Sequence, residues 1–131
     1  MALSRFGQVF GRWKGAIIGM IHVKALPGTP LNQYGVDQLV EMACTEAQIY
    51  KEAHVDGVLV ENMFDVPYVK RLSLGPEVVA CMTKVCCEVR RIIPRSVPCG
   101  VQVQYILRNA CTLDPRLTIF FHSRSMFRCQ Y

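Results

Sequence analysis

The sequence predicts an α/β fold in which parallel strands alternate with helices. Two apolar runs, residues 16–23 and 57–62, each end in polar side chains that are followed by a turn. The segment between them has apolar residues every three to four positions, which is typical of a helix packed on a sheet. A strand, a helix and a strand in this order form a parallel pair through a right-handed crossover. We therefore expect the polar strand ends to meet at one edge of the sheet.

The first helix and the strands on either side of it carry local signals. Residues 16–23 are apolar except for His22, which predicts a strand buried on both faces of a parallel sheet. Pro27 then requires a loop, and the helix is expected to begin with Asp37 as its N-cap and to end near His54. Residues 57–62 form the second strand.

A second helix and a third strand follow in the same order. Gly75, Pro76 and Glu77 predict the helix start, because proline fits the first turn and a carboxylate suits the positive end of the helix dipole. Pro94 ends this helix, and residues 97–103 form a short third strand. The chain thus repeats a strand–helix unit with short connections.

Two architectures begin with this repeat, an open doubly wound sheet and a (β/α)8 TIM barrel. The turn after the first strand carries no G-x-G-x-x-G motif, which excludes a dinucleotide-binding Rossmann domain. A complete barrel needs about 250 residues. Because the chain has 131 residues, we predict a partial TIM barrel of about three strand–helix units.

The composition excludes some classes of partner and indicates a reducing compartment. The net charge is +5, but the excess bases lie toward the two ends of the chain, so we expect no nucleic acid partner. No apolar run reaches the roughly 18 residues of a membrane-spanning helix, so we expect no transmembrane segment. The 7 cysteines form no Cys-x-x-Cys pair, which favours buried, reduced thiols and no metal site. No motif indicates a particular cofactor.

Residues 1–14 form a basic, amphipathic N-terminal arm. Apolar residues recur in it near helical spacing, and no acid stands among them. Two interpretations remain open, an organelle transit peptide and an arm packed across the bottom of the fold.

The polar side chains that end the first two strands are the candidate catalytic residues. His22 closes the first strand, where a side chain faces the mouth of a parallel barrel. Glu61 and Asn62 close the second strand, and strand alternation sends them to opposite sides, so we expect one of them to face the pocket. Asp65 is within reach of the same rim, although an aspartate at this place is also typical of a turn.

These residue types fit acid–base or ligand-binding chemistry. Glu61 would serve as a general base, as an acceptor for a substrate hydroxyl or as a metal ligand, and its burial requires a partner. The candidate substrate-binding residues are Lys24, which offers a positive charge at the rim, and Gln102, which ends the third strand. No phosphate-binding glycine loop and no nucleophile elbow is present.

Several segments between residues 16 and 103 resemble the BtpA family in their order and spacing. They are Ile18-Gly19-Met20-Ile21-His22, Leu26-Pro27-Gly28-Thr29-Pro30, Asp56-Gly57, Val60-Glu61-Asn62-Met63-Phe64-Asp65-Val66-Pro67-Tyr68, Pro76-Glu77, and Pro98 with Gly100-Val101-Gln102. Each segment alone is common, and their joint order makes the resemblance specific.

The resemblance implies a (β/α)8 barrel of the ribulose-phosphate-binding type and, with it, a small phosphorylated or sugar-like ligand. For cyanobacterial members it implies a link to photosystem I accumulation at thylakoid membranes. Animal members have no photosystem, so this role does not transfer to them. Their proteins often carry a suggested mitochondrial address, and the resemblance with the basic arm leads us to expect the protein in mitochondria or in the cytoplasm.

The chain departs from the family pattern after Val103. Residues 104–131 show no clear apolar period, and we predict a divergent, disordered or poorly packed tail there. The phosphate-binding loops of such barrels usually follow strands seven and eight, beyond what the chain supplies. We therefore expect a truncated or alternatively spliced animal-type member, divided into residues 1–14, 15–103 and 104–131.

Two functions follow from these observations. In the first, the chain is an inactive, truncated barrel whose parent binds or acts on a small ligand through His22, Glu61, Asn62 and Asp65. The alternative is a non-catalytic assembly or stability factor that contacts a membrane peripherally through the basic arm. Alanine at His22 and Glu61 would inactivate an enzyme and would be tolerated by an assembly factor.

Overall fold

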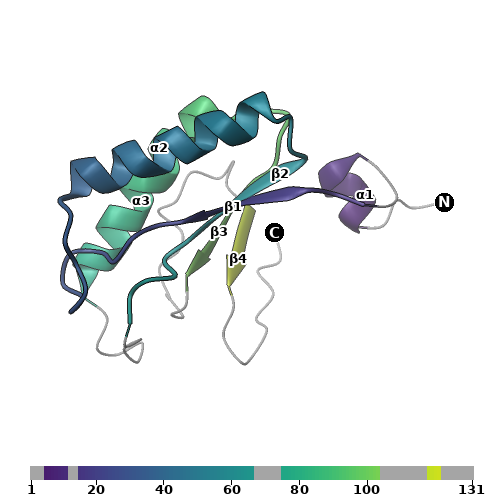
Figure 1. The fold of residues 1–131 in the computed structure, drawn as a ribbon. Helices are drawn as coiled ribbons and strands as arrows, with labels where there is room; N and C mark the ends of the chain where they lie inside the picture. Colours follow the sequence, from purple (N-terminus) through teal and green to yellow (C-terminus); the bar gives the residue numbers. More distant parts are fainter. Residues whose placement is uncertain (1–4, 12–14, 67–74, 104–117, 122–131) are drawn as a thin grey trace.

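The structure is a computed structural model that describes residues 5–11, 15–66, 75–103 and 118–121 (Figure 1). Strands and helices alternate along most of these residues, as the sequence predicts. In chain order the elements are α1 (Arg5–Phe10), β1 (Ile18–His22), α2 (Val36–Glu52), β2 (Gly57–Glu61), α3 (Pro76–Ile92), β3 (Cys99–Val103) and β4 (Thr118–Phe121). The α/β class and the partial strand–helix repeat are confirmed.

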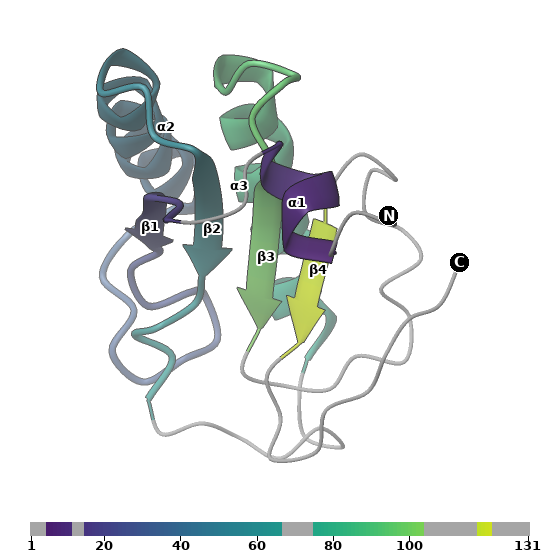
Figure 2. The same cartoon turned by 90° about the vertical axis from the view of Figure 1, so that its right-hand side faces the viewer.

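The four strands form one parallel sheet in the order β1-β2-β3-β4. His22 pairs in register with Glu61, and Glu61 pairs with Gln102, so the carboxyl ends of the first three strands are level with one another. Strands that are neighbours in sequence are also neighbours in space. Both long helices, α2 and α3, lie on the same face of this sheet (Figures 1 and 2).

The hydrophobic core fills the space between the sheet and the two long helices. Every second residue of a strand points into this core, as Val58 and Val60 of β2 do. The helices contribute their predicted apolar stripes, which are buried at Leu39, Ala43 and Ala47 in α2 and at Val78, Cys81, Met82, Val85, Cys86 and Val89 in α3. The strand residues between those that face the core therefore lie on the far face of the sheet, away from α2 and α3.

Helix α2 is held close to β1 by a contact between a glycine and an aromatic ring. A Cβ atom added at Gly19 would lie 2.7 Å from ring carbons of Tyr50, so any larger residue would displace that ring. The Tyr50 hydroxyl also donates a hydrogen bond of 2.8 Å to the carbonyl oxygen of Met20. This glycine therefore sets the distance between the helix and the strand.

Two predictions about local structure are wrong. The first strand is not buried on both faces, because Ile18 at its start is 46% exposed and every second residue faces away from the helices. The N-cap of α2 is Gly35 rather than Asp37. Asp37 is the second residue of the helix, and its carboxylate lies in the first turn. Helix α2 ends at Glu52, and His54 follows in the left-handed region with φ of 54°.

The ends of the chain are described only in part. Residues 1–4 and 12–14 of the basic arm lie outside the described residues, and the rest forms α1 near the amino ends of the strands, away from α2 and α3 (Figure 2). A ring carbon of Phe10 lies 3.1 Å from the place that a Cβ atom on Gly57 would take. Residues 104–117 and 122–131 are likewise outside the description, but Thr118–Phe121 form β4, a strand that we did not predict.

Among the described residues, no helix combines the length and the apolar character that a membrane crossing requires.

Candidate functional site

The site begins with an imidazole and a carboxylate at the carboxyl ends of neighbouring strands. His22 Nε2 lies 3.7 Å from Glu61 Oε2, and the two residues are directly opposite each other in the register of β1 and β2. The His22 side chain is 40% exposed and that of Glu61 is 11% exposed. The separation is that of an ion pair when His22 is protonated, and the exposed side of the imidazole is accessible to solvent.

Strand alternation places Glu61, rather than Asn62, beside His22. Because Val60 belongs to the core under the helices, Glu61 lies on the far face of the sheet. Gln102 of β3 pairs in register with Glu61 and is partly buried on this same face. His22, Glu61 and Gln102 therefore form one row across three strands.

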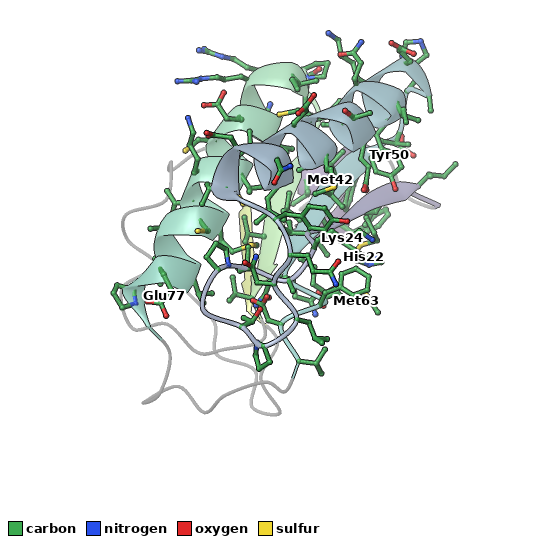
Figure 3. All side chains as sticks on the ribbon, turned by 60° about the vertical axis from the view of Figure 1, so that its left-hand side comes forward. His22, Lys24, Met42, Tyr50, Met63 and Glu77 are labelled. Carbon is green, nitrogen blue, oxygen red and sulfur yellow. The ribbon has the colours of Figure 1, made fainter. Side chains whose placement is uncertain are left out.

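The rim of the site carries a cation held over an aromatic ring. Lys24 Nζ lies 4.5 Å from the centre of the Phe64 ring, which is the geometry of a cation–π contact. Lys24 follows β1 and Phe64 follows β2, so this contact joins the two loops that leave the strands. Figure 3 shows His22 and Lys24 on the side of the molecule that carries Met63, with Glu77 away from them.

Asn62 and Asp65 are buried, with exposed fractions of 0% and 2%, and Asn62 lies on the opposite face of the sheet from Glu61, whose exposed fraction is 8%. Asp65 Oδ1 accepts a hydrogen bond of 2.8 Å from the backbone N–H of Leu26. Asp65 Oδ2 accepts another of 2.8 Å from Asn62 Nδ2. Burial raises the pKa of the Asp65 carboxyl above its ordinary value, while the hydrogen bonds from Leu26 and Asn62 oppose this rise.

The loop after β1 is held by further polar contacts of its own. The side-chain amide of Asn32 donates to the carbonyl oxygens of Ala25 and Tyr34, at 2.8 and 2.9 Å. The backbone N–H of Val23 donates to the carbonyl oxygen of Glu61 at 2.8 Å, which extends the pairing of β1 and β2 by one residue. The two loops at the site are therefore ordered by hydrogen bonds to each other and within themselves.

This arrangement can bind polar groups and move a proton. Glu61 accepts hydrogen bonds, His22 donates or accepts them, and Gln102 does both. His22 and Glu61 are also common metal ligands, but within the described ranges no third histidine, cysteine or carboxylate joins them in a group that could hold a metal ion. Phe64 is a rim residue that sequence reasoning missed, because an exposed phenylalanine in a loop carries no pattern that marks it.

Three of the described cysteines, Cys81, Cys86 and Cys99, are buried. Cys86 and Cys99 are buried in the core, and burial raises the pKa of both thiols, which keeps them protonated and unreactive. Cys81 is buried as well, and desolvation again raises its pKa. These cysteines act as small apolar residues of α3 and β3.

Comparison with known proteins relates the chain to one family. A model of the BtpA family matches residues 13–114. An uncharacterised mitochondrial protein of Caenorhabditis elegans is 50% identical over 66 residues, which are 50% of this chain and 24% of the worm protein. An uncharacterised protein of Pyrococcus furiosus is 39% identical over 75% of this chain and 35% of its own length. A putative sgc region protein of Escherichia coli is 31% identical over 77% of this chain and 37% of its own length.

The chain thus spans between about a quarter and somewhat over a third of the length of these relatives. No solved structure matches the chain.

Proposed function

Because this chain belongs to the BtpA family, we propose that it forms the first strands of a (β/α)8 barrel of the ribulose-phosphate-binding type. The sequential order of four parallel strands supports this proposal, as does the position of α2 and α3 on one face. A doubly wound sheet places helices on both faces and reverses its strand order at a switch point, whereas a barrel adds each new strand on the same side. In this proposal the far face of the sheet lines the barrel interior.

The function that we propose for the complete barrel is binding of, or action on, a small sugar-like or phosphorylated ligand. The site lies at the carboxyl ends of the strands, where barrel enzymes bind their substrates. The observation that carries this proposal is the 3.7 Å approach of His22 and Glu61 at level strand ends. Gln102, in register with Glu61, adds a hydrogen-bonding group to the same row.

Each residue of the proposed site has a separate role. Glu61 accepts a hydrogen bond from a ligand hydroxyl and takes up its proton, because a carboxylate beside an imidazole can act as a general base. His22 donates to, or accepts from, the neighbouring oxygen of the ligand. Gln102 orients the ligand through its amide, and Lys24 attracts an anionic group at the rim.

The experiment is a thermal-shift screen with sugars, sugar phosphates and inorganic phosphate. It uses a full-length family protein that contains residues 16–103 of this sequence, together with its His22→Ala and Glu61→Gln variants. A ligand that raises the melting temperature of the unaltered protein, and fails to raise that of either variant, supports the proposal. His54→Asn and Glu52→Gln are matched controls, because these exposed residues lie beyond the end of α2 or in its last turn.

The same screen applied to the 131-residue chain tests whether this chain is active by itself. We expect no ligand-dependent shift, since the chain supplies only part of the barrel wall and the phosphate-binding loops of such barrels follow later strands. A shift of equal size in the 131-residue chain would contradict the proposed inactivity. Loss of the shift in the control variants would contradict the assignment of the site.

A second candidate function, a peripheral membrane assembly factor, is supported by the apolar surface of α1. Phe6 and Val9 are each more than one third exposed, although Phe10 packs near Gly57. Flotation with anionic liposomes, with and without residues 1–14, separates the two functions. Flotation that depends on the arm, in a protein that tolerates alanine at His22 and Glu61, would favour the assembly factor.

We propose a mitochondrial location as well, on the strength of the basic arm and of the name of the worm relative. Import of the chain into isolated mitochondria, followed by sequencing of the amino terminus of the imported product, tests this. Cleavage within or just after residues 1–14 would support a transit peptide. An uncleaved chain that remains outside would refute the mitochondrial location.

A further inference from the structure

We propose that Asn62 and Asp65 are positioning residues that hold the His22–Glu61 pair in place, rather than groups that contact the ligand. This inference rests on the proposed function only in taking His22 and Glu61 as the site. Both Asn62 and Asp65 are almost completely buried, whereas His22 is well exposed. Side chains without access to solvent can fix the positions of neighbouring residues through hydrogen bonds, but a ligand that arrives from solvent cannot reach them.

The spacing of the contacts shows how Asp65 acts on the pair. Leu26 follows His22 by four residues, and Asp65 follows Glu61 by four residues. His22 and Glu61 are opposite each other at the ends of β1 and β2, and Asp65 accepts from the Leu26 N–H at 2.8 Å. The hydrogen bond therefore closes a ring that consists of the first four residues of each loop.

Burial of the Asp65 carboxylate is energetically unfavourable, so the hydrogen bonds that compensate for it are important. A carboxylate with an exposed fraction of 2% loses most of its hydration, which is unfavourable unless hydrogen bonds replace the water. Asp65 receives one such bond from a backbone N–H and one from Asn62, and both bonds are buried. The N–H of Leu26, itself completely buried, would lose its described acceptor without Asp65.

The position of His22 depends on the backbone that this ring holds. Its side chain is 40% exposed, so packing alone leaves the imidazole free to choose among rotamers. The backbone that carries it is fixed on one side by β1 and on the other by the contacts of Val23 and Leu26. Opening the ring would release the second of these constraints and broaden the separation of His22 and Glu61.

The chain contains a matched control for this proposal. At the opposite end of the same strand pair, Asp56 Oδ2 accepts a hydrogen bond of 2.9 Å from the backbone N–H of Ile17. This bond also joins a residue beside β1 to an aspartate beside β2, although it is exposed whereas the bond between Leu26 and Asp65 is buried. Asp56→Ala therefore removes a backbone-to-aspartate bond at the end of the strands away from His22.

The experiment compares Asp65→Ala, Asp65→Asn, Asn62→Ala and Asp56→Ala in the 131-residue chain by NMR. Two signals are followed, the exchange rate of the Leu26 amide and the imidazole nitrogen resonances of His22. We expect Asp65→Ala to accelerate the Leu26 exchange by roughly 10- to 100-fold and to shift the His22 resonances. Asp65→Asn keeps an oxygen for the Leu26 N–H but offers no second acceptor to Asn62, so it should restore the slow Leu26 exchange and leave part of the His22 shift.

Asp56→Ala should leave the His22 resonances where they are, even if it lowers stability. If Asp65→Ala destabilises the chain but leaves the His22 resonances unchanged, Asp65 has a structural role only and the inference is overturned. If Asp65→Ala does not fold, the comparison of Asn62→Ala with Asp56→Ala decides, because only Asn62→Ala should shift His22. None of these measurements needs a ligand, so a failed ligand screen and a failed positioning role are distinguished.

Discussion

The imidazole of His22 lies 3.7 Å from the carboxylate of Glu61, although an entire loop and helix separate the two residues in sequence. They meet because β1 and β2 run parallel with these residues in register. The His22 side chain is 40% exposed, so water screens the pair and its effect on stability is small.

We therefore predict that His22→Ala changes the free energy of unfolding by less than about 1 kcal/mol. Urea denaturation of the 131-residue chain, followed by circular dichroism, measures this change. The prediction separates a site residue from a residue of the core, because truncation of a buried side chain commonly costs 2–5 kcal/mol, to order of magnitude. A decrease in the free energy of unfolding above about 2 kcal/mol would mean that His22 contributes mainly to packing.

The pH dependence of stability should contain a contribution from Asp65. Its pKa in the folded chain is raised above the ordinary value of 3.8, chiefly because burial penalises the carboxylate. Between the unfolded and the folded pKa the folded state therefore binds more protons than the unfolded state, and the free energy of unfolding falls as pH rises through this window. Below the unfolded pKa the penalty is absent.

Asp65→Asn removes this titration and should flatten the profile. We expect the free energy of unfolding of the variant, minus that of the unaltered chain, to become more positive as pH rises from about 3.5 to 7. Glu88 has a lowered pKa, caused by hydrogen bonds from Lys84 and Arg91, but it titrates in both proteins and cancels in the difference. A difference that is constant over the range, or that falls as pH rises, would contradict the raised pKa of Asp65.

The contact between Gly19 and Tyr50 should make Gly19 sensitive to the addition of a single methyl group. A Cβ atom there lies 2.7 Å from the ring, and the ring is tied to β1 by the hydroxyl bond to Met20. We predict that Gly19→Ala lowers the free energy of unfolding by about 1–3 kcal/mol, as expected for overpacking.

A double-mutant cycle with Tyr50→Ala checks the cause of this loss. If the ring is responsible, Gly19→Ala should cost much less once the ring has been removed, which gives a coupling of about 1 kcal/mol or more between the two positions. Equal costs in both backgrounds would point to the glycine backbone rather than to the ring.

Much of this fold is predictable from local patterns. The spacing of apolar residues gave both long helices, and Gly75 with Pro76 gave the start of α3, since both act through the local backbone. β4 was missed, because Thr118–Phe121 is a short run whose pairing with β3 is decided by contacts distant in sequence. The exposure of Ile18 was missed for a similar reason, because an apolar run does not reveal whether both of its faces are covered.

The sequence predicts that His22, Glu61 and Gln102 end neighbouring strands, and the register of the sheet brings them into one row. Strand alternation alone left open whether Glu61 or Asn62 lies in that row, and the role of these residues in a site stays a prediction. The sequence contained no indication that Asp65 would accept the N–H of Leu26, because a backbone donor leaves no trace in residue identity. Near-complete burial separates Asn62 and Asp65 from His22, whose side chain is 40% exposed, but not from Glu61, whose exposed fraction is 8%.

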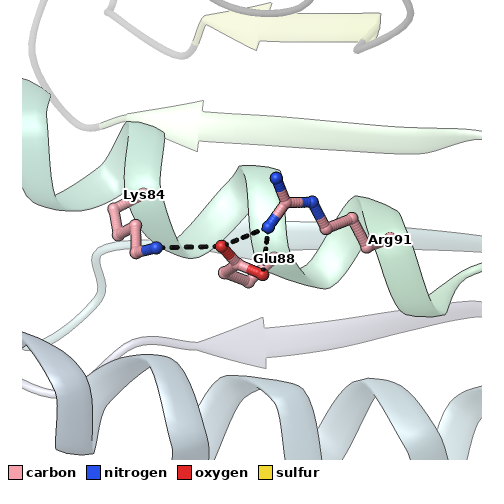
Figure 4. A network of polar contacts seen from close by, with 3 residues as sticks. All are labelled: Lys84, Glu88 and Arg91. Atoms are coloured by element: carbon pink, nitrogen blue, oxygen red, sulfur yellow. Dashed lines mark hydrogen bonds and ion pairs between the residues drawn. The ribbon is translucent and has the colours of Figure 1, made fainter.

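Two neighbouring arginines at the end of α3 also differ in a way that the sequence does not reveal, and this difference leads to a final prediction. Arg90 and Arg91 both lie in the last turn of α3, where a cation suits the negative end of the helix dipole. In the structure only Arg90 turns toward the following loop, where its guanidinium donates to the carbonyl oxygens of Val97, Ile93 and Pro94 at 2.8, 3.3 and 2.6 Å. Arg91 instead joins the exposed pair formed by Lys84 and Glu88 (Figure 4).

We predict that Arg90→Ala lowers the free energy of unfolding by about 1–3 kcal/mol, because it removes charge-assisted hydrogen bonds that order the connection from α3 to β3. Arg91→Ala should cost less than about 0.5 kcal/mol, as expected for a surface ion pair. Urea denaturation in low and in 0.5 M salt measures both changes. Salt should reduce the small effect of Arg91→Ala, whereas most of the effect of Arg90→Ala should persist, since its partners are uncharged carbonyl groups. Equal losses at the two positions would mean that both arginines act only through the helix dipole.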